Sequence, residues 1–187
     1  MLNIHMAREP VVDLVSGEVV YEEYLCRPEG MTVAQYFDVS SPTELWERER
    51  KCIEKALDIK TDIPKLINLT VDSLPFFLES SFVWKGGLEI VEWRGNREKL
   101  ISYLPLLYQR GLEVWIDDLS KDEFDFWKEK DVSGFKIWPD NMILGLFTNR
   151  LIVEGVETEL QLELAEKVGI RLVQGYLINR KETMIRA

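Results

Sequence analysis

Short apolar runs recur along the whole chain, and between them lie stretches whose apolar residues follow helical spacing. The runs that predict buried strands are Lys65–Leu69, Leu88–Val91, Leu112–Ile116, Phe135–Ile137, Leu151–Val153 and Arg171–Val173. Short runs of this kind, bounded by turn residues and alternating with helices, are typical of βα units. The pattern therefore predicts an α/β protein with a mainly parallel sheet.

The first two strands are predicted to pair differently from the rest. Val11–Leu14 and Glu18–Tyr24 are both rich in β-forming residues, and only a short link that ends at Gly17 separates them. So short a link allows only antiparallel pairing. The stretch that follows, up to Ser40, contains the breaker Pro28 and is predicted to be irregular.

The clearest helix signal begins at Ser41. This residue is a good N-cap, Pro42 suits the first helical position, and Glu44 completes a capping box. Further helices are predicted to begin near Ser73, to run from Asn96 to Arg110, from Ser120 to about Lys130, and from Thr158 to Gly169. The last residues, Asn179–Ala187, are predicted to be frayed or peripheral.

The number of strands predicts how the sheet closes. The two antiparallel strands and the six later runs make eight, which fits a TIM-like (β/α)8 barrel whose first strand runs antiparallel. Such a barrel typically takes about 250 residues, whereas this chain has 187, so some helices must be trimmed. The shortest connection, Pro139–Arg150, has room for roughly two or three helical turns. We expect a single barrel domain over residues 1–187.

Composition narrows the classes of function. The formal net charge is −10, which disfavours a nucleic acid polymer as partner because there is no basic excess to displace counterions from phosphates. No apolar run approaches the roughly 20 residues that span a bilayer, and the N-terminus lacks a secretion signal. Cys26 and Cys52 fit packed thiols in a reducing cytoplasm. Because His5 is the only histidine, histidine-centred catalysis and His-rich zinc sites are nearly excluded.

Polar residues lie within the apolar runs or at their ends. They are Glu23, Asn68, Glu89, Asp117, Lys136, Glu154 and Gln174. An unpaired charge in a buried strand costs roughly several kcal/mol, whereas a barrel enzyme builds its site from the C-terminal ends of its strands. We therefore predict one shared site. Oxygen ligands without cysteine or histidine select hard cations such as Mg²⁺ or Mn²⁺.

In chain order, these positions resemble the motifs of the EAL domain family, which hydrolyses cyclic di-GMP. The segment EEYLCR is similar to the signature Glu-Ala-Leu-Leu-Arg through Glu23, Leu25 and Arg27, with Tyr24 in place of the alanine. The other matches are INLT at Asn68, LEIVE at Glu89 and Glu92, IDDL at Asp117 and Asp118, FKI at Lys136, VEGVET at Glu154 and Glu157, and VQGY at Gln174. The order is that of the family, and the matches span nearly the whole chain.

The resemblance implies a role for each position. The ligands of a divalent cation would be Glu23, Asn68, Glu89 and Asp117, and Asp118 would help to hold a second cation. The catalytic residues would be Glu154, as base or water anchor, and Lys136, which would orient the attacking water. The substrate-binding residues would be Arg27, Leu25 and Gln174, with Arg27 on a phosphate, and the supporting residues would be Glu92 and Glu157.

Each of these side chains also has a plainer interpretation. Arg27 could form a surface ion pair, Lys136 could extend from a strand end into solvent, and Asn68 could start a turn. Glu92 and Glu157 could be solvated charges. Taken singly, most of these plain interpretations would be preferred, but together they would have to explain a series of coincidences in the family's order.

Two departures from the family pattern bear on activity. After the paired aspartates the family has Phe-Gly-Thr-Gly-Tyr, whereas this chain has Leu119–Glu123, so the loop is expected to take another course and Ser120 to start the helix early. Trp138 replaces the aspartate of the Lys-Ile-Asp motif, so a second cation is expected to bind weakly or not at all. Trp138 could stack on a guanine or fill the core, and we favour core filling. The altered loop and the shortened connection leave the family's usual dimer an open question.

Two hypotheses of different classes follow. The first is a cyclic di-GMP phosphodiesterase that uses two Mg²⁺ or Mn²⁺ ions to open the ring to linear pGpG. The alternative is a catalytically inactive EAL-like module that binds cyclic di-GMP or a protein partner. Neither hypothesis involves a membrane or a nucleic acid polymer.

Overall fold

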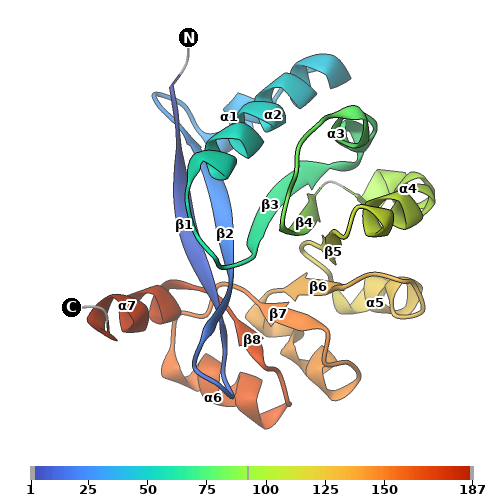
Figure 1. Ribbon diagram of the computed structural model, residues 1–187. Helices are drawn as coiled ribbons and strands as arrows, with labels where there is room; N and C mark the ends of the chain where they lie inside the picture. Colours follow the sequence, from blue (N-terminus) through green and yellow to red (C-terminus); the bar gives the residue numbers. More distant parts are fainter. Residues whose placement is uncertain (1–2, 92, 186–187) are drawn as a thin grey trace.

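The computed structural model describes residues 3–91 and 93–185, and within them eight strands form a closed barrel (Figure 1). The strands are β1 (Ile4–Asp13), β2 (Val19–Pro28), β3 (Lys65–Thr70), β4 (Gly86–Val91), β5 (Glu113–Ile116), β6 (Gly134–Ile137), β7 (Leu151–Val153) and β8 (Leu172–Val173). Strand β1 pairs antiparallel with both β2 and β8, and every other neighbouring pair is parallel. The predicted TIM-like barrel with an antiparallel first strand is confirmed.

Helices surround the strands on the outside of the barrel (Figure 1). The α-helices are α1 (Val33–Phe37), α2 (Pro42–Asp58), α3 (Leu74–Glu79), α4 (Arg97–Gln109), α5 (Lys121–Trp127), α6 (Glu159–Lys167) and α7 (Tyr176–Ile185). Three 3-10 segments add η1 (Val71–Ser73), η2 (Arg94–Asn96) and η3 (Pro139–Leu146) to the described chain. The η3 segment confirms that the connection after β6 is trimmed.

One sequence-based prediction was wrong. The stretch before Ser40 was expected to be irregular, but it contains α1, which a capping box between Thr32 and Gln35 initiates. The C-terminal tail, Asn179–Ala187, was expected to be frayed or peripheral. Helix α7 covers it as far as Ile185 on the outside of the barrel, and residues 186–187 lie outside the described residues. The first turn of α7 is anchored, because Ile178 is buried and the Leu177 amide donates to the carbonyl of Val156 at 3.0 Å.

Smaller differences concern strand and helix ends. The β1–β2 hairpin extends well beyond the predicted strands, so that Ile4 pairs with Pro28 at its far end. Residue Asn96 precedes α4 as predicted, but its side chain makes no capping hydrogen bond. Helix α5 starts after Ser120, as the altered loop predicted, and ends at Trp127 rather than near Lys130.

A layer of apolar side chains fills the barrel below its rim, by which we mean the edge formed by the carboxyl ends of the parallel strands. One hydrophobic cluster joins four side chains from the alternate strands β1, β3, β5 and β7, namely Val11, Leu66, Trp115 and Ile152. Four side chains from alternate strands form the usual packing layer of a TIM barrel. The neighbouring strands β4 and β6 supply Gly87 and Gly134, where an added Cβ would lie 2.9 and 2.4 Å from the Trp115 ring. These glycines therefore make room for the indole.

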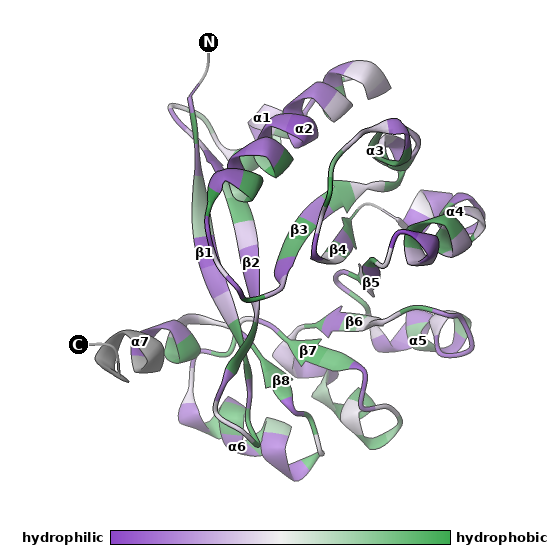
Figure 2. Cartoon of the chain, viewed as in Figure 1, coloured by the Kyte–Doolittle hydropathy of each residue, from purple (hydrophilic) through white to green (hydrophobic). Residues whose placement is uncertain are grey.

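The rest of the core lies between the barrel and the helices. Helices such as α2, α4 and α6 carry both hydrophobic and hydrophilic stretches (Figure 2). Their buried residues, among them Ile53, Leu104 and Ala165, belong to one large apolar cluster together with the outward-facing side chains of the strands. The interior apolar layer is thus separate from the main core, and it forms the floor on which the polar residues rest.

Candidate active site

A layer of polar side chains lies directly above the apolar floor. It comes from the strands that do not supply the floor, and it consists of Glu23 (β2), Glu89 (β4), Lys136 (β6) and Gln174, which directly follows β8. In the strand ladders Glu23 is paired with Leu66, Glu89 with Trp115 and Lys136 with Ile152. All four polar side chains are buried. The barrel therefore places three charged groups in its own interior.

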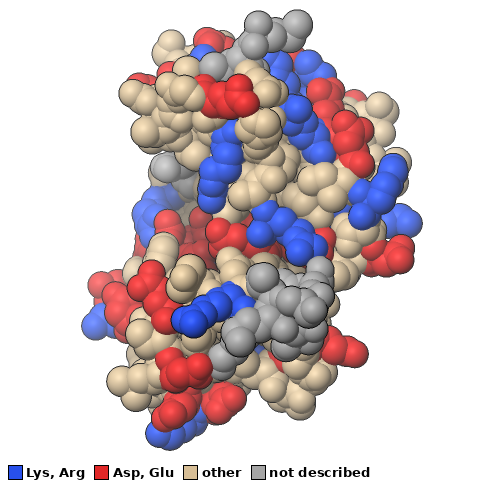
Figure 3. All heavy atoms as spheres, turned by 90° about the vertical axis from the view of Figure 1, so that its left-hand side faces the viewer, with Lys and Arg blue, Asp and Glu red and all other residues tan. Residues whose placement is uncertain are grey.

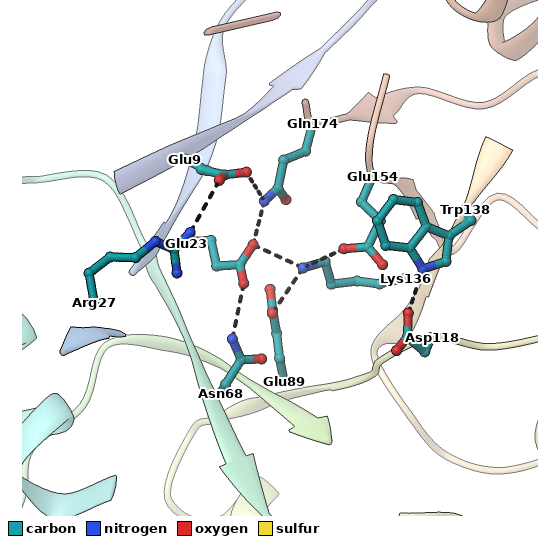
Figure 4. A network of polar contacts seen from close by, with 10 residues as sticks. All are labelled: Glu9, Glu23, Arg27, Asn68, Glu89, Asp118, Lys136, Trp138, Glu154 and Gln174. Carbon is teal, nitrogen blue, oxygen red and sulfur yellow. Dashed lines mark hydrogen bonds and ion pairs between the residues drawn. The ribbon is translucent and has the colours of Figure 1, made fainter. Parts of the chain in front are cut away.

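Lys136 is the centre of this polar layer. Its Nζ lies 3.0 Å from Oε2 of Glu23, 2.9 Å from Oε2 of Glu89 and 3.2 Å from Oε2 of Glu154 (Figure 4). Gln174 donates from its amide to Glu23 and, at 3.3 Å, to Glu9. Around Lys136 the carboxyl groups outnumber the single ammonium, so the cluster is negatively charged when all of its carboxyls are ionised.

The electrostatics of the buried groups reflect this imbalance. Burial lowers the pKa of Lys136, but the surrounding carboxylates outweigh it and hold the pKa well above its usual range. Burial raises the pKa of Glu23, yet Lys136 and the hydrogen bonds to Glu23 bring it down to about 2. Burial raises the pKa of Glu89 well above its usual range, and the charge of Glu23 adds to this effect. Lys136 therefore keeps its proton, whereas Glu89 is a carboxyl that would benefit from a further cation.

A second set of polar residues lies one step closer to the rim. Side chains two residues apart on a strand point to the same face, so the floor residues Val11, Leu66, Trp115 and Ile152 are followed toward the rim by Glu9, Asn68, Asp117 and Glu154. The Asn68 amide donates to Oε1 of Glu23 at 3.1 Å. Every predicted residue at a strand end therefore lies on one of two adjacent polar layers.

The rim carboxyls have raised pKa values. Burial raises the pKa of Asp117 to about 6, with an opposing effect of Lys136 and a smaller contribution from Asp118. Burial likewise raises the pKa of Glu154 to about 7, against the effect of Lys136. Both groups therefore change charge near neutral pH.

Four oxygens of this site are buried without a hydrogen-bond partner. They are Oδ1 of Asn68, Oε1 of Glu89, Oδ1 of Asp117 and Oε1 of Gln174. A buried acceptor without a partner is costly, and here the unpaired atoms are hard oxygen donors gathered next to excess negative charge. This is the donor set that Mg²⁺, Mn²⁺ or Ca²⁺ prefers. The residues present therefore fit a divalent cation.

A further group of carboxylates lies at the outer edge. One carboxylate oxygen each from Asp117, Asp118 and Glu154 lies within 4.8 Å of the other two. The indole Nε1 of Trp138 donates to Oδ1 of Asp118 at 2.6 Å (Figure 4). The sequence favoured a position for the Trp138 side chain in the core, and this prediction is wrong. The residue is 50% exposed, because the loop after β6 places its ring against Gly155 at the rim rather than under a helix.

A cavity of about 370 Å³ opens beside these groups. Its lining includes Asn68 and Asp117 from the site, Leu25 and Arg27 from β2, and Glu49 from α2. This volume is within the range of small-molecule sites. On the face shown in Figure 3, acidic side chains lie across the middle of the molecule, and basic side chains lie on both sides of them.

The structure decides between several interpretations of single residues. Lys136 is buried, so it does not extend into solvent, and Asn68 lies within β3 rather than starting a turn. Arg27 is half-exposed and pairs only loosely, at 3.9 Å, with Glu9. Glu157 is exposed, and its backbone amide donates to the Gln161 side chain at 2.8 Å. Glu92 lies outside the described residues.

Two carboxylates near the site were not assigned to it from the sequence. Glu9 stands where the family pattern has a glutamine before Pro10, and it contacts Gln174 and lies opposite Glu23 in the hairpin register. Glu49 on α2 is buried and accepts hydrogen bonds from the backbone N–H and the hydroxyl of Thr70, at 2.9 and 3.2 Å. No local sequence signal identifies Glu49, because its partner belongs to a distant strand.

No protein-family model and no curated protein sequence matches this chain. Solved structures do match it. BlrP1 of Klebsiella pneumoniae, solved as a complex with manganese and cy-diGMP, has a TM-score of 0.75 at 18% identity over 93% of this chain and 55% of its own. The chain thus spans about half the length of BlrP1.

Two further matches have similar values. YkuI of Bacillus subtilis, a protein with an EAL domain in complex with substrate c-di-GMP and calcium, has a TM-score of 0.74 at 18% identity, covering 94% of this chain and 55% of its own. The PaMucR phosphodiesterase in complex with c-di-GMP has a TM-score of 0.70 at 21% identity, covering 94% of this chain and 95% of its own.

The chain has the EAL-domain fold. The resemblance inferred from the motifs is confirmed at the level of the fold. Within this EAL fold, no helix of the described residues is both long and apolar enough to cross a membrane.

Proposed function

We propose that this protein is a cyclic di-GMP phosphodiesterase that opens the ring of its substrate to linear pGpG. The main support is the convergence of Glu23, Glu89 and Glu154 on the buried Lys136, next to unpaired oxygens at the same rim. A site of this composition suits divalent cations that act on a phosphodiester. BlrP1 and YkuI, which share the fold, were solved with cyclic di-GMP and with manganese or calcium.

The cations would be Mg²⁺ or Mn²⁺, and we propose two of them. The inner cation position would consist of Glu23, Asn68, Glu89 and Asp117. The outer cation position would consist of Asp117, Asp118 and Glu154, whose oxygens lie within 4.8 Å of one another. When bound, such cations supply Lewis acidity, which acidifies a water molecule and offsets charge on the phosphate oxygens.

The charged side chains of the chain have distinct tasks in this proposal. Lys136 keeps its proton, because the carboxylates around it hold its pKa well above the usual range, and it offsets negative charge on the reacting phosphate. Glu154 has a pKa of about 7, so near neutral pH it can accept the proton of the attacking water. The water oxygen bonds to phosphorus, one P–O3′ bond breaks, and the proton passes on to the leaving O3′. The product is pGpG with one terminal 5′-phosphate.

Other residues would bind and orient. The cavity beside the site would hold part of the dinucleotide, with Leu25 against it and the half-exposed Arg27 on a phosphate. Gln174 donates to Glu23 and thereby fixes the orientation of that carboxylate. Glu92 and Glu157 would support the loops that carry the ligands.

The test is product formation. The protein is incubated with cyclic di-GMP and Mn²⁺, and chromatography follows the appearance of pGpG. Glu23→Ala and Glu154→Ala should each abolish turnover, whereas Glu163→Ala, an exposed carboxylate on α6, should leave it unchanged. Persistent turnover in either site variant would contradict the assigned roles.

A second function is favoured by one observation. Trp138 stands where the family pattern has a carboxylate, and the loop after Asp118 also departs from that pattern. This departure favours an inactive module that binds cyclic di-GMP or a protein partner. Calorimetric binding of cyclic di-GMP without pGpG would establish the first form of that alternative, and neither binding nor product would leave the second.

A further inference from the structure

Asp118 has an unusual backbone that its neighbours hold in place. Its φ of +50° is the single positive value for a residue other than glycine in the described part of the chain. Residues with a side chain disfavour this conformation, although aspartate tolerates it better than most. Arg94 donates to the carbonyl of Asp118 at 2.5 Å, and the Trp93 indole donates to the carbonyl of Asp117 at 2.8 Å. Two side chains that follow β4 therefore fix the loop that follows β5.

The side chain of Asp118 is fixed from a third direction. Trp138 follows β6, and its Nε1 donates to Oδ1 of Asp118 at 2.6 Å. The ring lies so close to Gly155, which follows β7, that an added Cβ there would lie 2.5 Å from Cζ3 of the indole. Gly155 therefore gives the indole room to reach Asp118. Residues that follow the four successive strands β4 to β7 thus meet around Asp118 and the indole that binds it.

The bond leaves Asp118 able to ligate. An ionised carboxylate has about four acceptor positions on its two oxygens, and Trp138 occupies one of them. One oxygen of Asp118 lies within 4.8 Å of one oxygen each of Asp117 and Glu154, and the carboxylate retains acceptor positions beyond the one that Trp138 uses. Outer-shell donors of this kind orient a ligand toward a metal and are often needed for affinity. The buried unpaired oxygen of Asp117, which belongs to this group, is an independent indication of a cation here, and Glu89 in the layer below has another.

We propose that Trp138 is a positioning residue for the outer cation position, a role that deepens, and rests on, the proposed function. Its indole N–H presents the Asp118 carboxylate to a divalent cation that Asp117 and Glu154 also hold. This reverses the expectation from sequence alone, in which Trp138 weakens or removes a second cation. The tryptophan itself ligates nothing.

The exposure of Trp138 supports this role over a purely structural one. The side chain is half-exposed at the rim, whereas the other five tryptophans are buried. The five buried rings contribute their area to the core, whereas half of the Trp138 side chain is left to solvent. The hydrogen bond of its indole goes to Asp118 in the cation group. The N–H, rather than the area of the ring, therefore orients the Asp118 carboxylate.

The test measures Mn²⁺ binding to the full chain by isothermal titration calorimetry, without substrate. The wild-type protein should bind two Mn²⁺ ions per chain. Trp138→Phe keeps a ring but removes the N–H, and it should weaken the second ion by about 10- to 100-fold while it changes the first by less than about twofold. Trp84→Phe is the matched control, because it removes an indole N–H bond to the Gly87 carbonyl at the start of β4. That control should bind both ions as the wild type does.

A double variant distinguishes the loss of the indole N–H from a general loss of structure. Asp118→Gly removes the carboxylate and adopts a positive φ without strain, so it should weaken the second ion by itself. Adding Trp138→Phe to Asp118→Gly should have no further effect on either ion. Tryptophan fluorescence gives an independent readout, because a bound Mn²⁺ ion quenches a nearby indole. The quenching that accompanies the second ion in the wild type should be weakened in Asp118→Gly, which keeps the Trp138 indole.

Each contrary outcome has a defined meaning. Wild-type binding of both ions by Trp138→Phe would overturn the inference and leave the proposed function standing. Equal loss of both ions, with a lowered melting temperature, would make Trp138 a structural residue and also overturn the inference. Binding of one ion by the wild type would overturn it as well, and the pGpG assay would still judge the function. No Mn²⁺ binding at all would overturn both.

Discussion

The Nζ of Lys136 lies 2.9 Å from Oε2 of Glu89, a carboxyl without any exposed surface, in the interior of the barrel. Together with Glu23 and Glu154, this pair concentrates three acids around one base. A buried ion pair adds little stability over an apolar pair, but removing one partner leaves an uncompensated charge. Lys136 is therefore required for the fold as well as for the proposed chemistry.

Lys136→Met, which preserves the length of the side chain, should destabilise the metal-free protein by about 3–5 kcal/mol. Urea unfolding in EDTA measures the loss. Lys128→Met is the control, because Lys128 pairs with Asp125 on the exposed surface of α5 and should show no measurable change.

The Lys136→Met variant also tests whether a divalent cation binds beside this position. Added Mn²⁺ should restore more stability to Lys136→Met than to the wild type, because a cation can take over the charge of the missing ammonium. An equal response to Mn²⁺ in both proteins would argue against a cation beside Lys136.

Cation binding should strengthen as pH rises. Asp117 has a pKa of about 6 and Glu154 a pKa of about 7 in the metal-free protein, and a cation must displace the protons that these groups hold. Affinity for Mn²⁺ should therefore increase roughly tenfold between pH 6 and pH 8. Calorimetry in buffers of different ionisation enthalpy should detect proton release. A constant affinity over this range would contradict the assignment of these two carboxylates.

Glu49 should make the protein more stable at mildly acidic pH than at neutral pH. Burial raises its pKa to about 7 from an ordinary value of 4.5; hydrogen bonds from Ser73 and Thr70 oppose this, and the charge of Asp72 adds to it. Between these values the folded state holds a proton that the unfolded state has lost, so stability falls as pH rises from about 4.5 to about 7.

Glu49→Gln can still accept the Thr70 hydrogen bond, and it should flatten this part of the stability curve. The difference between wild type and variant should change by at most about 3 kcal/mol across the window. Urea unfolding in EDTA at several pH values gives the curve. Parallel curves for the two proteins would show that Glu49 is ionised throughout.

Gly155 and Gly169 form a matched pair for testing the Trp138 contact. Both have positive φ values, +65° and +82°, so alanine costs about 1–2 kcal/mol of backbone strain at each. At Gly169 an added Cβ meets nothing within 4 Å, whereas at Gly155 it lies 2.5 Å from the Trp138 ring. Gly155→Ala should therefore cost more stability than Gly169→Ala, and it alone should weaken the second Mn²⁺ ion. Equal effects of the two variants would show that the ring moves aside freely.

Much of the site could be predicted because the face on which each site residue lies follows from the sequence of its own strand. Leu66, Trp115 and Ile152 are inward apolar residues, and the polar residue two positions later takes the same face. A parallel barrel then brings those positions to one rim, so Asn68, Asp117 and Glu154 could be grouped without coordinates.

What the sequence did not reveal depends on contacts between distant segments. The exposure of Trp138 is set by Gly155 and Asp118, which belong to other loops. Helix α7 forms because Ile178 finds a buried place against the barrel. The capping box of Thr32 and Gln35 is a local signal, but the nearby Pro28 and Gly30 outweighed it.

The barrel closes where β8 meets β1. Within the described residues the pairs Val12–Val173 and Asp13–Leu172 join β1 to β8, and this join is as short as those between β5 and β6 and between β7 and β8. Just beyond the β1–β8 pairs, the Gln174 amide donates to Glu9 on β1 and Glu23 on β2. If the pairing between β1 and β8 opens transiently, Gln174 and Glu23 separate. The polar layer around Lys136 then loses its arrangement before any helix unfolds. Gln174 therefore links the proposed site to the closure of the barrel, and hydrogen exchange should be faster at the short joins on either side of β8 than along the β1–β2 hairpin.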